Sequence, residues 1–175
     1  MSCIAVYPGT FDPIHYGHID IALRAAELFD KVVLGIYDKP TKTLLFSTEE
    51  RLALAREAMA DNPRIEVVPY SGLTVDFARQ IGATVLVRGL RVTADFELEY
   101  QMALTNRQLA PGIESVCLMT HQDHAFLSSS IVKEVALLRG DVSRMVPPHV
   151  AVALEVRRGL RETKHEPVPL YSLRD

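Results

Sequence analysis

The sequence predicts a doubly wound α/β fold, in which helices cover both faces of a single parallel five-stranded sheet. Short apolar runs alternate along the chain with longer segments that have helical spacing, and this alternation is typical of a parallel sheet with crossover helices. No segment has the composition of a linker, so we expect one domain over residues 1–160 of the 175. Nearly every unusual polar residue follows an apolar run, and such sheets bind ligands at the carboxyl ends of their strands.

Local signals place the elements one after another. The strands are the apolar runs, at residues 4–6, 32–37, 65–68, 85–87 and 116–119. The helices are expected at residues 19–29, 47–60, 75–81, 94–109, 131–138 and 147–160. Ser47 and Glu50 have the spacing of a capping box, and Gly82 fits a C-terminal cap. Pro147 and Pro148 are typical of the start of a helix.

The composition argues against several classes of protein. With 48% hydrophobic and 23% charged residues and a net charge of −3, the chain is not expected to bind nucleic acid in general. No apolar run approaches the ~20 residues of a membrane span, and we see no signal peptide at the N-terminus. Cys3 and Cys117 lie in apolar runs and are expected to be buried thiols in a reducing compartment, the cytoplasm. Residues 161–175 are charged, contain two prolines, and are expected to form a flexible polar tail.

The loop after the first strand is suited to a phosphate group. Residues 7–18 read YPGTFDPIHYGH, and their glycines and prolines shape the loop and let other groups approach its backbone closely. Thr10 offers a hydroxyl, and His18 lies at the start of a helix, where free N–H groups attract anions. The loop matches neither the Walker pattern nor the dinucleotide pattern.

Two cations follow other strands. Lys42 lies in the polar loop after the second strand, and Arg88 lies at the end of the fourth. If both faced one crevice, they would suit a dianionic phosphate, with Lys42 as a point charge and Arg88 as a fork. A solvated loop lysine is the alternative for Lys42.

These motifs resemble those of phosphopantetheine adenylyltransferases, a family of the nucleotidylyltransferase superfamily. The run His15-Tyr16-Gly17-His18 matches the superfamily pattern His-x-Gly-His, and the longer YPGTFDPIHYGH narrows the resemblance to this family. Residues 88–91, Arg-Gly-Leu-Arg, are similar to a second family signature, and residues 128–133 resemble the superfamily's Ser-rich signature. The resemblance covers residues 5–160 and implies a Rossmann-like nucleotidylyltransferase fold.

The resemblance also implies a reaction. The family transfers the adenylyl group of ATP to 4′-phosphopantetheine, giving dephospho-coenzyme A and pyrophosphate, the penultimate step of coenzyme A biosynthesis. The acceptor phosphate attacks directly in line, so catalysis is positioning and charge stabilisation. Mg²⁺ is expected on the ATP phosphates, with no metal site built from the protein. The family also implies a cytoplasmic homohexamer.

Site residues carry over from the family motifs to matching positions. The catalytic residues implied are His18, Thr10, Lys42 and Arg91. The ATP-binding residues implied are Thr10, Phe11, His18, Gly89, Leu90, Arg91, Glu99, His124, Ala125, Phe126, Leu127, Ser128, Ser129 and Ser130. The substrate-binding residues implied are Thr10, Lys42, Thr74, Arg88, Met102 and Asn106. Three positions depart from the family: His15 is commonly Thr, His124 commonly Trp or Tyr, and Leu127 usually Ile.

Several alternatives stay open at this point. Met102 could be a core contact, Glu99 part of a charged helix face, and Ser128 to Ser130 a helix cap. A metal could bind near His121 and His124, although their spacing is not a standard zinc pattern. The acceptor could instead be nicotinamide mononucleotide or glycerol 3-phosphate, as in sister enzymes. The chain could also be a nucleotide-binding regulatory module without catalysis, although intact motifs argue against this.

Overall fold

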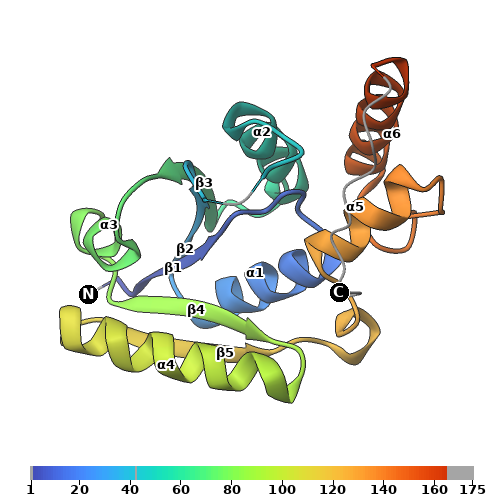
Figure 1. The fold of residues 1–175 in the computed structure, drawn as a ribbon. Coiled ribbons are helices and arrows are strands. Elements are labelled where there is room, and N and C mark those ends of the chain that lie inside the picture. Colours follow the sequence, from blue (N-terminus) through green and yellow to red (C-terminus); the bar gives the residue numbers. More distant parts are fainter. Residues whose placement is uncertain (1, 42, 165–175) are drawn as a thin grey trace.

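The computed structural model describes residues 2–41 and 43–164 and confirms the α/β class. Its strands are parallel and follow the order β3-β2-β1-β4-β5 across one sheet (Figure 1). The strands are β1 (Ile4–Gly9), β2 (Lys31–Tyr37), β3 (Ile65–Tyr70), β4 (Val85–Leu90) and β5 (Glu114–Met119). From β1 the chain moves outward to β2 and β3, and then crosses back so that β4 lies on the other side of β1. The strand order therefore reverses between β1 and β4, where such sheets bind their ligands.

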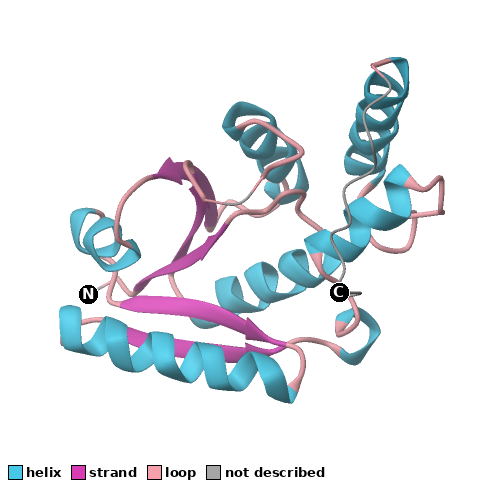
Figure 2. Cartoon of the chain, in the orientation of Figure 1, coloured by secondary structure: helices cyan, strands magenta, loops and turns pink. Residues whose placement is uncertain are grey.

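Helices cover both faces of the sheet (Figure 2). They are α1 (Tyr16–Leu28), α2 (Thr48–Met59), α3 (Thr74–Gln80), α4 (Thr93–Leu109), α5 (Ser129–Leu137) and α6 (Pro148–Thr163), with a short 3₁₀ helix η1 (Gln122–His124). One buried cluster joins the sheet to α1, α2, α5 and α6, and a second joins its other face to α3. Consecutive strand residues divide between the clusters: Val32 and Leu34 belong to the first, and Val33 belongs to the second. This division follows from the alternation of side chains along a strand.

The predicted helix ends are confirmed where a cap could be recognised. Ser47 Oγ accepts a hydrogen bond from the Glu50 amide, and Glu50 Oε2 accepts one from the Ser47 amide at 2.7 Å. Gly82 follows α3 in the left-handed conformation, with φ of 71°. Pro148 is the first residue of α6. These caps satisfy backbone groups that the helix itself leaves without partners.

The loop between β1 and α1 is shorter than predicted. β1 continues to Gly9, because residues 7–9 still pair with β2, and α1 already begins at Tyr16. His18 therefore lies within the first turn of α1, whereas the sequence predicts it just before the helix. The amides of His18 and Ile19 both donate to the His15 carbonyl, which holds this turn.

The prediction of two buried thiols was wrong. Cys3 is partly buried and Cys117 is exposed, and neither forms a disulfide. Cys117 lies on β5, which is an edge strand with only β4 as a neighbour. An apolar run at a sheet edge does not have to be covered by the same chain, which explains the error.

The C-terminal part of the chain is described only up to Lys164. α6 runs to Thr163, so it extends past residue 160, where we had expected the domain to end. The flexible tail is predicted over residues 161–175, and residues 165–175 of it lie outside the described part of the chain. No helix within residues 2–41 and 43–164 combines the length and the apolar character that crossing a membrane requires.

Candidate active site

A cavity of about 510 Å³ opens where the strand order reverses. Its walls come from the ends of β1 and β4, the first turn of α1, and the start of α5. The lining residues are Tyr7, Pro8, Gly9, Thr10, Phe11, His15, Gly17, His18, Ile21, Tyr37, Tyr70, Thr74, Arg88, Gly89, Arg91, Glu99, Thr120, Leu127, Ser128, Ser129 and Ser130. Segments far apart in the sequence thus meet at the edge that the parallel sheet predicted.

The floor of the cavity depends on a glycine beside an aromatic ring. Phe11 is buried and has a φ of 50°, in the left-handed region that non-glycine residues seldom adopt. A Cβ atom on Gly9 would lie 2.9 Å from the Phe11 ring, so only glycine fits there. The Phe11 ring in turn packs edge to face with the His18 ring, and the ring centroids are 4.8 Å apart. Phe11 thereby helps to fix the orientation of the His18 imidazole.

His15 and His18 form a stacked pair. Their ring centroids are 3.6 Å apart and their planes differ by 20°. Burial is the main cause of a low pKa at His15, and the nearby charges of Arg91 and His124 act in the same direction, so that the pKa is about 3. His15 is therefore uncharged at neutral pH, and the His18 ring lies against a neutral imidazole.

Arg88 is held at one end of the cavity by a carboxylate. Its Nε and Nη2 donate to the two carboxylate oxygens of Glu99 at 2.7 and 2.6 Å, and its Nη1 donates to the Pro8 carbonyl at 3.2 Å. Burial alone would lower the pKa of Arg88, but the hydrogen bonds and charge of Glu99 outweigh burial and raise it. Glu99, expected beside ATP, thus contacts the arginine expected to bind the acceptor phosphate.

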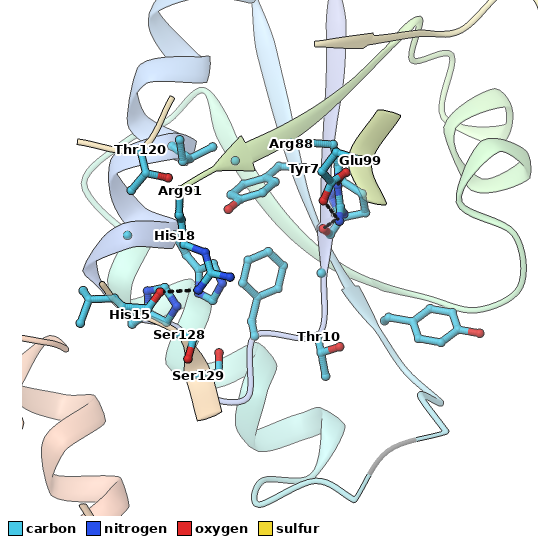
Figure 3. Close-up of a pocket in the computed structure, with 18 of the residues that line it drawn as sticks. Tyr7, Thr10, His15, His18, Arg88, Arg91, Glu99, Thr120, Ser128 and Ser129 are labelled. Atoms are coloured by element: carbon cyan, nitrogen blue, oxygen red, sulfur yellow. Dashed lines mark hydrogen bonds and ion pairs between the residues drawn. The ribbon is translucent and has the colours of Figure 1, made fainter. Parts of the chain in front are cut away.

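Arg91 joins two loops at the other end of the cavity. Its guanidinium donates to the Asp95 carboxylate at 3.1 Å and, through Nη1, to the Leu127 carbonyl at 2.7 Å. Figure 3 shows Arg91 beside His15 and His18, well away from Arg88. The two arginines therefore place positive charge at two separate ends of the cavity, with His18 on the Arg91 side.

The serine-rich segment both caps a helix and lines the cavity. Ser128 Oγ accepts from the Ile131 amide at 3.1 Å as the N-cap of α5, so the capping interpretation is confirmed. Ser129 Oγ donates to the Pro13 carbonyl at 2.9 Å, and Ser130 also lines the cavity. The free N–H groups at the start of α5 face the same space, where they could bind an anion.

A smaller cavity of about 60 Å³ adjoins the Arg88 side. It shares Thr74, Arg88 and Glu99 with the main cavity, and α4 adds Met102 and Asn106. Thr74 Oγ1 lies 3.0 Å from the Tyr70 hydroxyl. Met102 is 46% exposed, which argues against a role as a core residue. The predicted substrate residues Thr74, Arg88, Met102 and Asn106 therefore lie together.

Some predicted residues lie outside the main cavity or outside the described part of the chain. Leu90, Ala125, Phe126 and His124 are not among its lining residues, and the His124 ring stacks on Tyr16 with centroids 6.1 Å apart. The prediction for Lys42 concerns a position that lies outside the described residues. Within the described residues no group of three or more His, Cys, Asp or Glu side chains could hold a metal ion.

Sequence analysis missed one residue that supports the site from behind. Arg51 of α2 is fully buried and donates to the carbonyls of Thr10 at 2.7 Å and Tyr37 at 2.9 Å. It thereby joins the ends of β1 and β2. One signal was present in the sequence, because Arg51 occupies the same helix face as the buried Ala55, one turn later.

The fold is shared with a protein of known structure. A crystal structure from Vibrio parahaemolyticus, described as a nicotinate-nucleotide adenylyltransferase, superimposes with a TM-score of 0.66, covering 89% of this chain and 99% of that one. Its sequence is only 17% identical, so it supports the architecture and not the substrate.

Sequence comparison goes further. The profile of the cytidylyltransferase-like family matches residues 6–135. The phosphopantetheine adenylyltransferase of Herpetosiphon aurantiacus is 54% identical over 152 residues, which cover 87% of this chain and 92% of the relative. The enzyme of the same name from Roseiflexus sp. is 52% identical over 158 residues, covering 90% of this chain and 99% of the relative. The chain therefore belongs to the cytidylyltransferase-like family and, within it, to the phosphopantetheine adenylyltransferases.

Proposed function

We propose that the chain transfers the adenylyl group of ATP to 4′-phosphopantetheine and releases pyrophosphate, and that the reaction is reversible. One observation carries this proposal: a single cavity holds two arginines at separate ends, with His18 beside Arg91 (Figure 3). A reaction between two phosphate-bearing substrates needs such separate anion sites, with the reacting phosphorus between them.

The acceptor phosphate is the nucleophile in this mechanism. One of its oxygens forms a bond to the α-phosphorus of ATP, and the bond from that phosphorus to the bridging oxygen breaks. Pyrophosphate leaves with the bonding electrons, so no protein nucleophile is needed. His18 donates a hydrogen bond to the α-phosphate, where negative charge builds in the transition state. The packing of His15 and Phe11 against His18 keeps this donor in place.

The acceptor binds on the Arg88 side. The contacts of Arg88 with Glu99 and Pro8 use three of the five N–H groups of a guanidinium, which leaves two for a phosphate. The Thr10 hydroxyl orients the attacking oxygen, and Lys42 adds a second cation. The pantetheine arm extends into the smaller cavity beside Thr74, Met102 and Asn106.

ATP binds on the Arg91 side. Arg91 and the hydroxyl of Ser130 receive the β- and γ-phosphates at the start of α5, since the Ser129 hydroxyl already donates to the Pro13 carbonyl. Glu99 is better explained as the partner of Arg88 than as an ATP ligand. Mg²⁺ reaches the site on the ATP phosphates, where it neutralises their charge.

The sister reaction with nicotinamide mononucleotide is not favoured. The relatives at about 50% identity carry the name phosphopantetheine adenylyltransferase, whereas the structure named for a nicotinate nucleotide is 17% identical. The cytoplasmic location and the homohexamer are further parts of the proposal, supported by the family motifs of residues 5–160.

The decisive experiment offers the protein each acceptor in turn. The protein is incubated with ATP, Mg²⁺ and either phosphopantetheine, nicotinamide mononucleotide or glycerol 3-phosphate, and products are identified by mass spectrometry. We expect dephospho-coenzyme A and pyrophosphate with phosphopantetheine alone. Dephosphorylated pantetheine is the control and should not react, because it lacks the attacking oxygen. A product with another acceptor and none with phosphopantetheine would overturn the proposal.

A further inference from the structure

A buried ion pair lies directly behind the cavity. Asp12 and Lys133 are 1% and 4% exposed, and Lys133 Nζ donates to Asp12 Oδ2 at 2.9 Å. Asp12 follows Thr10 and Phe11 in the loop after β1, and Lys133 lies on α5. The two residues are 121 positions apart in the sequence, so the pair connects opposite ends of the chain.

Asp12 also holds a third segment. Its Oδ2 accepts from the Leu45 amide at 2.9 Å, and its Oδ1 accepts from the Phe46 amide at 2.9 Å. Residues 45 and 46 end the loop that follows β2. One carboxylate therefore ties the β1 loop, the β2 loop and α5 to one another.

Stability alone is a weak explanation for this pair. Two buried charges lose their hydration on folding, and their attraction often does no more than offset that loss. Neutral side chains of similar volume would fill the space at little or no cost. The pair is better explained by the geometry that it imposes on the three segments.

We propose that Asp12 and Lys133 form a positioning pair that sets the distance between the two phosphate sites. The inference rests on the proposed function, in which the acceptor binds near Thr10 and ATP binds at the start of α5. Lys133 lies one helical turn after Ser129 and Ser130, on the same face of α5. Asp12 lies two residues after Thr10. A shift of the pair therefore moves the acceptor site relative to the ATP site, while neither residue lines the cavity.

The test compares variants in which one or both charges are removed. Asp12→Asn and Lys133→Met each remove one charge of the buried pair and keep the other, and we expect both variants to unfold at lower temperature. Asp12→Asn/Lys133→Met removes both charges and keeps an oxygen that can accept from Leu45 or Phe46, so its melting temperature should recover most of the loss. Its kcat should nevertheless stay about 10- to 100-fold below wild type, because small displacements of in-line groups have effects of this size.

Two further variants show whether the effect belongs to this pair. Lys133→Arg keeps a cation at this position, and its kcat should stay within about fivefold of wild type. Lys31→Met is the matched control, since Lys31 is also ion-paired, to Glu66 at 2.6 Å, but lies at the start of β2 away from the cavity. It should leave kcat and both KM values unchanged.

The outcomes separate positioning from folding. A stable double variant with wild-type kcat would show that the pair has no role in positioning. A double variant that does not fold would make the pair part of the folding core and would equally overturn the inference. Wild-type protein that forms no dephospho-coenzyme A in the same assay would instead overturn the proposed function, which is a separate result.

Discussion

His18 is surrounded by side chains that fix its position and leave it facing the cavity. Its ring stacks on His15 and makes an edge-to-face contact with Phe11, and it lies in the first turn of α1. A group held this firmly can stabilise developing charge without having to reorganise when the reaction occurs. His18 is the residue on which the proposed mechanism depends most.

His18→Ala should lower kcat by about 10²- to 10³-fold, because a donor to the transition state is lost while ground-state contacts remain. ATP affinity, measured by calorimetric titration, should change little. His149→Ala is the control, since His149 lies on α6 and contacts the Leu54 carbonyl outside the cavity. Unchanged kcat in His18→Ala would remove His18 from the mechanism.

His15 makes stability depend on pH. Its pKa is near 6.5 in the unfolded chain and about 3 in the folded protein, since burial disfavours the charged ring. Between these values the unfolded state binds a proton that the folded state does not. The free energy of unfolding therefore falls as the pH drops from 6.5 towards 3, by about 1.4 kcal/mol per pH unit from this residue.

His15→Thr places the residue that we expect in most of the family at this position, and it removes the acid sensitivity. From pH 6.5 to 4.5 the wild type should lose about 2 to 3 kcal/mol more stability than the variant. Urea unfolding at a series of pH values measures this difference, and the other histidines cancel because both proteins contain them. Parallel stability curves for the two proteins would mean that His15 is protonated in the folded state.

At the scale of a single element, α5 combines two tasks in its first residues. Ser128 and Ser130 both line the cavity, but the Ser128 hydroxyl also accepts from the Ile131 amide as the N-cap, whereas Ser130 lies within the first turn of the helix. The sequence Ser-Ser-Ser alone does not show which hydroxyl performs which task. The structure separates them, because only the N-cap position can reach the amides of the first turn.

Ser128→Ala and Ser130→Ala should therefore differ. Loss of the cap in Ser128→Ala should lower the free energy of unfolding by about 1 kcal/mol. Ser130→Ala should leave unfolding nearly unchanged and raise KM for ATP severalfold, because a donor to the phosphates is lost. Chemical denaturation and steady-state kinetics on both variants make the comparison. Equal stability losses in the two variants would contradict this division of tasks.

At the scale of the whole molecule, α4 and β5 leave a large apolar surface uncovered. Phe96, Leu98, Tyr100 and Leu104 of α4 are each more than half exposed, and Met119 of β5 is 71% exposed. A surface with this much exposed apolar area is typical of contact with another chain. This surface gives the proposed homohexamer a physical basis beyond the resemblance.

Light scattering should therefore give the wild type the mass of six chains. Leu98→Arg/Leu104→Arg should yield a smaller species, because two buried guanidinium groups would lack partners at a subunit contact. Glu27→Arg is the control, being an exposed polar residue on α1 and not on this surface, and should retain the wild-type mass. Wild-type protein that runs as a single chain at all concentrations would contradict the prediction.

The sequence alone determined the fold class, the caps of α2, α3 and α6, and the edge of the sheet where Thr10, His18, Arg88 and Arg91 meet. The caps depend on residues only a few positions apart in the sequence. The position of the site depends on the rule that the carboxyl ends of parallel strands lie at the same edge of the sheet.

Only the tertiary structure decided which groups become partners. Glu99 holds Arg88, Arg51 holds the Thr10 carbonyl across 41 positions, and Asp12 meets Lys133 across 121. No local pattern records such pairings, because they depend on which segments the sheet order brings together. The same reason explains the exposure of Cys117 and the low pKa of His15: burial is set by everything that surrounds a side chain, and the residues surrounding these two come from distant parts of the chain.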